Sequence, residues 1–319
     1  MNQQYKDREV IDNIVNNVGK VVIGKEKEIY NILKAILSKG HVLIEDVPGV
    51  GKTTLVKALA KSLDLSYSRI QFTPDLLPSD ITGISIYNQK DMSFEFKKGP
   101  IFSNIVLADE INRTSPKTQS ALLEVMEENQ ISEGNITYKL ERPFFVLATE
   151  NPIEHQGTFS LPEAQLDRFI IKISLGYPSK EAENEILNVY KNNEPLEELE
   201  AVATKEDIVN LQNKVREVNV SDELTRFMVD IAEITRKTKY LSLGVSTRGV
   251  LALQKVCQAT AFLKGRSYVI PDDVKENIEI VLSHRVILSP LGNSSGYSKE
   301  AVITDLVKRL EPPKVRYNE

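Results

Sequence analysis

The chain has 319 residues, of which 41% are hydrophobic and 27% charged, as in soluble globular proteins that bury a large core. A net charge of -5 provides no overall basic field and so disfavours a nucleic-acid partner. The single cysteine, Cys257, excludes an intrachain disulfide and indicates a reducing compartment. No apolar run reaches the ~20 residues of a membrane helix, and the N-terminus lacks the apolar core of a signal peptide. We therefore expect a cytoplasmic protein without membrane insertion.

Apolar, β-prone runs recur in the first half of the chain, with helical segments between them. This alternation predicts an α/β fold with a mainly parallel sheet and helices on both faces, in which ligands bind at the carboxyl ends of the strands. The predicted strands are His41–Glu45, Tyr67–Gln71, Ile105–Ala108, Phe144–Thr149 and Phe169–Ile173. Two further pairs of short runs predict hairpins, namely Ile84–Tyr87 with Phe94–Phe96, and Gln130–Glu133 with Ile136–Tyr138.

Beyond Tyr177 the pattern becomes helical, with capping residues before several apolar-periodic segments. The predicted helices are Lys180–Lys191, Ile208–Val218, Asp222–Lys239, a helix that Ser246 precedes and Gly265 ends, and Pro271–Leu282. We therefore predict an α/β domain over residues 1–177 and a smaller, all-helical domain over residues 178–319.

The most informative segment follows the first predicted strand and precedes a helix, which is the context of a phosphate-binding P-loop. Gly49 and Gly51 allow the backbone to approach phosphate, and the N–H groups at the helix start favour an anion. Lys52 can reach the outer phosphates, and the Thr53 hydroxyl can bind Mg²⁺. Asp46 departs from the usual G-x-x-x-x-G-K-[ST], whose first position is glycine, so a glycine-rich turn with an incidental lysine is the alternative. The residues predicted to bind the nucleotide are Asp46, Val47, Pro48, Gly49, Val50, Gly51, Lys52, Thr53 and Thr54.

Two carboxylates, Asp109 and Glu110, directly follow the apolar run Ile105–Ala108. A strand that delivers acids at its tip suits a nucleotide site, where Asp109 would belong to the Mg²⁺ shell. Glu110 would then orient and polarise the attacking water. The alternative is a pair of surface acids at the start of a loop.

Three further polar residues have roles that composition leaves open. Asn151 follows a predicted strand and could touch the γ-phosphate or the water, or simply form part of a turn. Arg168 precedes the last strand and could instead pair with Asp167 or Glu163 on the surface. Arg248 lies in the first turn of a predicted helix, where a cation opposes the helix dipole. Either bound phosphate or a nearby carboxylate should therefore compensate its charge.

Taken in chain order, these motifs resemble those of AAA+ ATPases and, most closely, the MoxR family. The resemblance runs from about Val22 to at least Arg285 and is strongest through Phe169. Asp46 is similar to the family's own form of the loop. The segments that carry the resemblance are Glu45–Thr53, Phe72–Gly83, Gly99–Phe102, Leu107–Arg113, Lys117–Glu124 and Leu161–Phe169.

The resemblance implies a P-loop NTPase domain of the AAA+ type followed by an all-α lid, with ATP and Mg²⁺ as cofactors. It implies that Ile23 and Gly24 pack on adenine, that Asn151 is sensor 1, and that Arg248 is sensor 2 in the lid. Arg168 resembles an arginine finger, which acts on ATP held by the neighbouring subunit and can be worth ~10³–10⁵ in rate. A homo-oligomeric ring, expected to be a hexamer, follows from this, with both hairpins facing the pore.

Two positions depart from the family's pattern. Glu150 stands where the family is expected to have Gln, directly before Asn151. Gly249 follows Arg248 where Ala is commoner, and glycine loosens the start of a helix.

The resemblance implies a Mg²⁺-dependent ATPase that remodels or activates protein complexes in a chaperone-like way, often with a von Willebrand factor A-type partner. A nucleotide-controlled assembly switch with little turnover is the second hypothesis, although a switch has less need of a carboxylate such as Glu110. A nucleic-acid motor is disfavoured by the acidic balance and by the lack of a basic, aromatic-rich segment. A chelatase-like subunit is a further alternative without a visible metal site. The sequence does not name the client complex.

Overall fold

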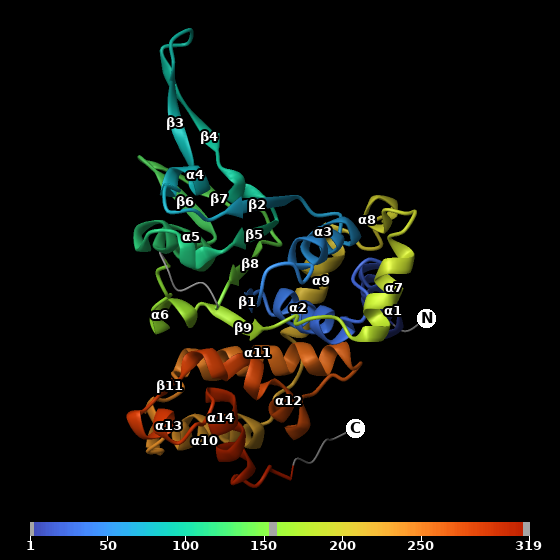
Figure 1. The fold of residues 1–319 in the computed structure, drawn as a ribbon, viewed down its shortest axis with the longest axis vertical. Coiled ribbons are helices and arrows are strands. Elements are labelled where there is room, and N and C mark those ends of the chain that lie inside the picture. Colours follow the sequence, from blue (N-terminus) through green and yellow to red (C-terminus); the bar gives the residue numbers. More distant parts are fainter. Residues whose placement is uncertain (1–2, 153–157, 315–319) are drawn as a thin grey trace.

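A five-stranded parallel sheet forms the centre of the α/β body in the computed structural model, which describes residues 3–152 and 158–314 (Figure 1). The strands lie in the order β2-β5-β8-β1-β9 and pair in parallel throughout. Their bounds are β1 His41–Glu45, β2 Tyr67–Gln71, β5 Ile105–Asp109, β8 Phe145–Glu150 and β9 Phe169–Ile173. The predicted α/β fold is confirmed, and each strand end lies within one residue of its predicted position.

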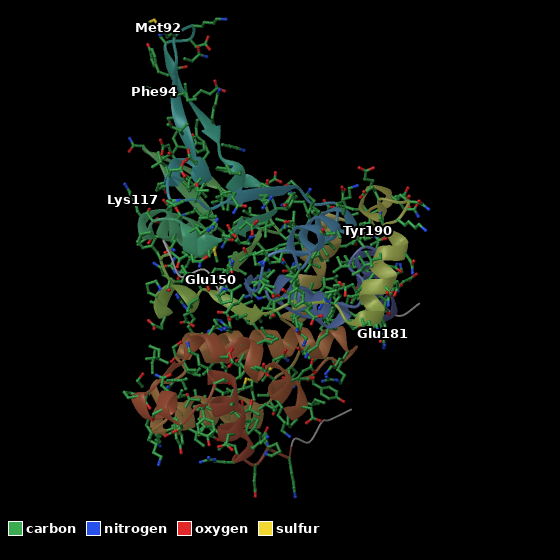
Figure 2. The ribbon with its side chains drawn as sticks, in the orientation of Figure 1. Met92, Phe94, Lys117, Glu150, Glu181 and Tyr190 are labelled. Atoms are coloured by element: carbon green, nitrogen blue, oxygen red, sulfur yellow. The ribbon has the colours of Figure 1, made fainter. Side chains whose placement is uncertain are left out.

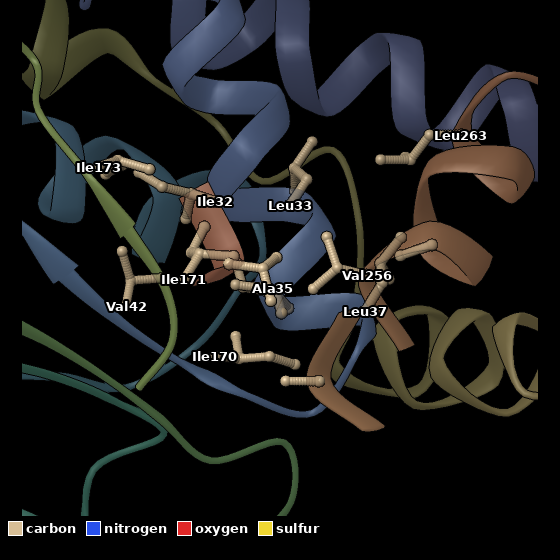
Figure 3. Packing of buried hydrophobic residues seen from close by; sticks show 14 of the residues in the cluster. Ile32, Leu33, Ala35, Leu37, Val42, Ile170, Ile171, Ile173, Val256 and Leu263 are labelled. Atoms are coloured by element: carbon tan, nitrogen blue, oxygen red, sulfur yellow. The ribbon is translucent and has the colours of Figure 1, made fainter. Parts of the chain in front are cut away.

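Helices cover both faces of this sheet because alternate strand residues point to opposite sides. Val42 and Ile44 belong to a core with α1 (Gln3–Gly19), α2 (Glu26–Leu37) and α3 (Lys52–Ser62). Leu43, between them, packs in a second core with α5 (Pro116–Glu128). Figure 3 shows the first core, in which side chains of α2 lie against those of β1 and β9. Each fully buried Ile or Leu contributes ~1.5–3 kcal/mol, so the sheet is fixed from both sides.

Both predicted hairpins are present as separate two-stranded sheets. The first, β3 (Gly83–Asn88) and β4 (Ser93–Lys98), projects far from the body after the short helix α4 (Pro78–Thr82), and η1 (Pro100–Phe102) follows it (Figure 1). The second consists of β6 (Gln130–Glu133) and β7 (Ile136–Lys139). Phe96 stacks on Tyr138 with ring centroids 4.4 Å apart, so the two hairpins are in contact.

The first helices beyond residue 177 pack on the α/β body. They are α7 (Lys180–Val189), α8 (Pro195–Glu198) and α9 (Lys205–Val215). Gln212 of α9 donates to the carbonyl of Ile36 in α2 at 2.7 Å, and Tyr190 donates to the Val21 carbonyl at 3.2 Å. The predicted capping box of Thr204 and Asp207 is present at the start of α9. The domain boundary at residue 177 stays a prediction.

The lid that follows is mostly helical, and it lies below the edge strand β9 in Figure 1. It also contains a short antiparallel pair that the sequence pattern did not predict, because strands of two and three residues are too short to show a period. The elements are α10 Asp222–Lys237, β10 Leu241–Leu243, α11 Thr247–Leu263, α12 Pro271–Leu282, η3 Ser283–Arg285, β11 Ile287–Leu288, α13 Pro290–Ser294 and α14 Lys299–Lys308.

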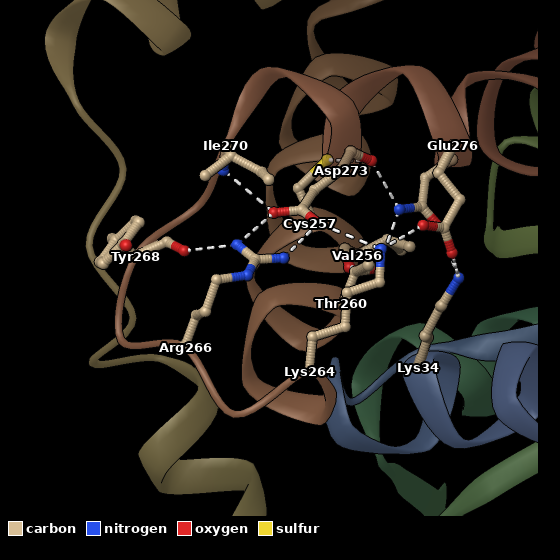
Figure 4. A network of polar contacts seen from close by, with 11 residues as sticks. Lys34, Val256, Cys257, Thr260, Lys264, Arg266, Tyr268, Ile270, Asp273 and Glu276 are labelled. Atoms are coloured by element: carbon tan, nitrogen blue, oxygen red, sulfur yellow. Dashed lines mark hydrogen bonds and ion pairs between the residues drawn. The ribbon is translucent and has the colours of Figure 1, made fainter. Parts of the chain in front are cut away.

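A polar network stabilises the lid and joins it to α2 (Figure 4). The carboxylate of Asp273 is fully buried and accepts from both terminal nitrogens of Arg266, at 2.6 and 2.8 Å. The side chain of Lys34 in α2 is only 6% exposed and pairs with Glu276 of α12 at 2.7 Å. Buried charges need such partners, since removing one partner costs ~3–5 kcal/mol. Cys257 is buried beside this network, and burial raises the pKa of its thiol, as expected for an unreactive cysteine.

The lid also covers the free edge of β9. His284 Nε2 lies 2.9 Å from the Phe169 carbonyl, and Arg285 donates to the carbonyls of Phe169 and Ile170 at 2.6 and 3.2 Å. Arg285 also pairs with Asp167 at 2.6 Å, with a side chain that is 2% exposed. Unpaired edge carbonyls are thus satisfied by the lid, which fixes its position on the body. In residues 3–152 and 158–314, no helix combines the length and apolar character of a membrane span.

Candidate nucleotide site

The P-loop joins β1 to α3 and has the backbone form that its glycines predict. Gly49 and Gly51 have φ of 86° and 87°, a region that costs other residues ~1–2 kcal/mol. No side chain caps α3 at Gly51, so the N–H groups of its first turn are available to an anion. Lys52 donates from Nζ to the carbonyl of Asp46 at 3.1 Å. The loop around Gly49 and Gly51 is exposed, which makes it an open surface rather than a closed pocket.

The carboxylate of Asp46 binds both the backbone N–H of Val47 in the loop, at 3.0 Å, and the segment that follows β9. One carboxylate oxygen accepts from the backbone N–H groups of Leu175 and Gly176, at 2.5 and 2.7 Å, and from the Ser174 hydroxyl at 3.2 Å. Its backbone N–H donates to the carbonyl of Glu150 at 3.1 Å, and its own carbonyl accepts from the P-loop lysine. Every polar group of Asp46 therefore has a partner within the protein, and its contact with the nucleotide stays a prediction.

Asp109 and Glu110 lie at the carboxyl end of β5, and one hydroxyl joins them. Thr149 donates to Asp109 Oδ1 at 2.7 Å and accepts from the backbone N–H of Glu110 at 2.8 Å. The other oxygen of Asp109 pairs with Arg69 of β2, at 2.5 Å from Nη2 and 3.1 Å from Nε. Asp109 therefore faces the P-loop edge of the sheet with a guanidinium already bound to it.

Glu110 has a backbone conformation that is uncommon for residues other than glycine, with φ of 59°. Such strain persists only where the surroundings hold it, and it is frequent at functional sites. Here η2 (Ile111–Arg113) follows at once. Glu110 Oε2 accepts from Gln71 Nε2 at 2.9 Å and from Arg113 Nη1 at 3.0 Å. The carboxylate is thus fixed from two sides in front of the strand tips.

Asn151 is buried at the end of β8, next to the strand that carries Asp109. Its carbonyl accepts from Asn112 Nδ2 at 3.5 Å. The preceding residue, Glu150, pairs in register with Glu45 of β1. Burial and the charge of Glu45 raise the pKa of Glu150 to about 7, against the opposing effect of Lys172. Lys172 itself binds Glu45 at 2.8 Å.

The two predicted arginines lie together at the amino ends of the strands, opposite the end at which the P-loop begins. Arg168 and Arg248 both pair with Glu127 near the end of α5, at 3.3 and 2.6 Å. They line a cavity of about 340 Å³ with His41, the first residue of β1, whereas the P-loop follows the last residue of that strand. The anion that compensates Arg248 is therefore Glu127. The lid holds Arg248 at the amino ends of the strands, away from the P-loop of its own chain, and its role as sensor 2 stays a prediction.

Ile23 and Gly24 lie beside the start of α7. Ile23 is buried, and Gly24 has φ of 72° with no room for a side chain, since a Cβ there would lie 2.8 Å from that of Ala182. Lys25 donates to the carbonyls of Leu175 and, at 3.1 Å, Tyr177. The segment predicted to hold adenine is therefore fastened to the same backbone that binds Asp46.

Four residues of this site were missed at the level of sequence, namely Arg69, Gln71, Arg113 and Thr149. Arg69 and Gln71 are two positions apart, so they point to the same face of β2, and β2 is the neighbour of β5. The sequence therefore shows that the two side chains share a face of β2. It does not show that β2 lies beside β5, which is what brings them to the acids. A cavity of about 800 Å³ between α2, β9 and the lid contains none of the predicted phosphate-binding residues.

Comparisons with known proteins agree with the resemblance to AAA+ ATPases that the sequence motifs indicate. Residues 41–171 match the model of the ATPase family associated with various cellular activities (AAA), and residues 233–306 match the AAA lid domain. A Bacillus subtilis protein named YeaC is 50% identical over 94% of this chain and 93% of its own. The Mycobacterium tuberculosis protein named Chaperone MoxR1 is 40% identical over 96% of this chain and 83% of its own.

A crystal structure of a protein from Cytophaga hutchinsonii superposes with a TM-score of 0.91 at 42% identity, covering 98% of this chain and 97% of that one. The likeness therefore covers both the α/β body and the lid. Members of the AAA+ class bind nucleotides and typically assemble as rings. The chain belongs to the MoxR family of AAA+ ATPases.

Proposed function

We propose that this protein hydrolyses ATP with Mg²⁺ and uses the cycle to remodel or activate a protein complex in a chaperone-like way. One observation carries the proposal: Glu110, in strained backbone at the tip of β5, is held by Gln71 and Arg113 on the edge of the sheet where the P-loop begins. A pure switch has no need of a carboxylate positioned so firmly. This constellation supports turnover rather than binding alone.

The residues present fit a nucleoside triphosphate and a divalent cation. The open first turn of α3 and the two glycines suit phosphate. Lys52 is within reach of a phosphate bound there, because its ammonium donates to the Asp46 carbonyl of the same loop. Thr53 and Asp109 would hold Mg²⁺, which neutralises charge on the phosphates when bound. Glu110 would orient the attacking water and accept its proton. Asn151 would contact the γ-phosphate or that water, and Ile23 with Gly24 would receive the base.

The two arginines support a ring in which active sites lie between subunits. Arg168 and Arg248 are at the amino ends of the strands, whereas Lys52 follows the carboxyl end of β1. A cation at one edge of the sheet can reach phosphates at the opposite edge only on another copy. We therefore infer that both arginines act on the neighbour's ATP, and we keep a homohexamer as the expected assembly.

The β3–β4 hairpin supplies a surface for a client (Figure 2). Met92 and Phe94 lie near its tip with 78% and 74% of their surface exposed, and Tyr87 packs on Phe94 with centroids 5.3 Å apart. Exposed apolar groups of this kind mark interaction sites. We propose that they contact the client in the pore of the ring, that a von Willebrand factor A-type protein is a partner, and that the protein works in the cytoplasm.

A complementation experiment tests the hydrolytic site and its assembly together. Lys52→Ala should lose ATP binding, and Arg168→Ala should keep binding but lose turnover. When the two inactive variants are mixed, sites formed by an intact P-loop and an intact arginine should restore part of the ATPase rate. An unchanged zero rate after mixing, with rings visible by light scattering, would contradict action between subunits.

The client is sought with Glu110→Gln, which should bind ATP but hydrolyse it poorly. Affinity capture from native lysate with this variant and ATP is compared with capture by Lys52→Ala. A protein enriched only by the ATP-bound variant, especially one with an A-type domain, supports remodelling. Recovery of nothing but the chain itself, or of nucleic acid that nuclease removes, would oppose it.

A further inference from the structure

A three-residue segment links the phosphate end of the proposed site to its base end. This segment, called the connector here, comprises Ser174, Leu175 and Gly176, and it leads from β9 toward α7. From the P-loop side, the carboxylate of Asp46 accepts from all three, at 3.2, 2.5 and 2.7 Å. Gly176 has φ of 62°, a left-handed conformation that glycine adopts without strain.

The opposite side of the connector is held by Lys25. Its ammonium donates to the Leu175 carbonyl and to the Tyr177 carbonyl, the latter at 3.1 Å. Lys25 directly follows Gly24, where a Cβ would lie 2.8 Å from that of Ala182 at the start of α7. Leu175 is therefore bound through its N–H by the P-loop and through its C=O by the segment proposed to receive adenine.

The Asp46 contacts are those of a charge that needs its partners. The residue is 6% exposed, and its second oxygen accepts from the N–H of Val47 at 3.0 Å. Charge-assisted bonds to backbone N–H groups are shorter and stronger than neutral ones. A glycine at this position, as in the ordinary P-loop pattern, would leave the N–H groups of the connector without this acceptor.

We propose that Asp46 is a positioning residue which, with Lys25, clamps the connector and so sets the place of the base-binding segment relative to the P-loop. The inference rests on the proposed function. A ligand that spans both ends benefits from this preorganisation, because binding does not have to order the connector. A ligand that touches only the P-loop does not benefit. The clamp thus acts on recognition of the nucleoside, not on recognition of phosphate.

The test compares two ligands on one protein by titration calorimetry, ADP with Mg²⁺ and inorganic tripolyphosphate with Mg²⁺. Asp46→Gly regenerates the ordinary loop pattern and keeps the backbone groups that bond to Glu150 and Lys52. We expect ADP to bind at least tenfold more weakly, or about 1.4 kcal/mol, and tripolyphosphate to change less than threefold. Lys25→Gln, on the other side of the connector, should show the same pattern.

Matched controls separate the clamp from other losses. Asp207→Asn removes a carboxylate that also accepts a backbone N–H, that of Thr204 at 2.9 Å, and should change neither ligand. Lys52→Ala should weaken both, which shows that tripolyphosphate reports on the P-loop. If Asp46→Gly does not fold by thermal melting, Asp46→Asn replaces it, with an expected threefold or greater loss for ADP only.

Each other result overturns the inference. Equal weakening of both ligands by Asp46→Gly would mean that Asp46 only shapes the P-loop. Unchanged ADP affinity in Lys25→Gln would mean that no clamp exists, even if the Asp46 variants lose ADP. Wild-type protein that binds neither ligand would overturn the proposed function as well, whereas wild-type binding with equal losses overturns the clamp alone.

Discussion

Glu150 should make the stability of this protein fall as pH rises, and replacing it with glutamine should remove that effect. The carboxyl lies at the end of β8 beside Glu45, and burial and this neighbour raise its pKa from 4.5 to about 7. Between these two values the folded state holds a proton that the unfolded chain releases. Stability is therefore greatest below pH 4.5 for this group and is lost as pH rises through 7.

The magnitude follows from the two pKa values. A pKa raised from 4.5 to about 7 costs about 3 kcal/mol of unfolding free energy once the carboxyl is ionised in both the folded and the unfolded state, at 1.36 kcal/mol per pH unit. Most of this cost is absent at pH 5 and present at pH 8. The stabilisation by Glu150→Gln should thus be about 2.5 kcal/mol larger at pH 8 than at pH 5. Any constant effect of the amide cancels in that difference.

The assay is urea unfolding of both proteins at pH 5, 6, 7 and 8. Glu128→Gln, at an exposed position of α5, is the control and should show no such trend. Glu45→Gln should reduce the trend without abolishing it, because burial is the larger cause. A difference between Glu150→Gln and wild type that stays within about 0.5 kcal/mol across this range would refute the reasoning.

In Glu150→Gln, which lacks the opposing effect of Glu150, stability should fall as pH falls from 6.5 to 4, because burial lowers the pKa of His41 to about 4 and the unfolded chain gains its proton below about 6.5; thermal melting of this variant between pH 7 and 4 measures the loss. Thr149→Val removes the hydroxyl shared by the strand-tip acids and should cost ~1–3 kcal/mol in urea unfolding and slow ATP turnover. Arg285→Met leaves Asp167 and the edge carbonyls of β9 without their donor, so unfolding free energy should fall by ~3–5 kcal/mol. Arg69→Met removes a cation from Asp109, the carboxylate proposed to bind Mg²⁺, and should tighten Mn²⁺ binding with ADP by roughly threefold or more, seen by electron paramagnetic resonance.

The α/β fold was predictable because its cause is local. Strands such as His41–Glu45 are apolar throughout, and the glycines of the P-loop can adopt the positive φ that the loop requires. The position of Asp109 and Glu110 at the tip of a buried strand was predictable for the same reason, because the apolar run directly precedes them in the sequence. In each case the pattern that predicts the structure lies within about ten residues.

Features that depend on partners far along the chain were not predictable in this way. The carboxylate of Asp46 binds Gly176, 130 positions away, and Arg69 binds Asp109, 40 positions away. Both contacts depend on which strands are neighbours, and the hydrophobic periodicity of a sequence does not specify strand order. Arg69 and Gln71 lie on one face of β2, but their contacts with the acids of β5 follow only from the position of β5 beside β2.

The position of Arg248 depends on how the lid docks, which no local pattern specifies. His284 and Arg285 bind the edge carbonyls of β9, and this contact directs the first turn of α11 toward the end of α5. There Glu127, which opposes the dipole at the carboxyl end of its helix, is stabilised by Arg248 and by Arg168 together. Their side chains are 50% and 30% exposed, and ion pairs of such exposure are worth ~0–1 kcal/mol. Phosphates presented by a neighbouring subunit could therefore displace Glu127 at little cost. The ion pairs with Glu127 fix both arginines in place without preventing the proposed contact with the neighbour's ATP.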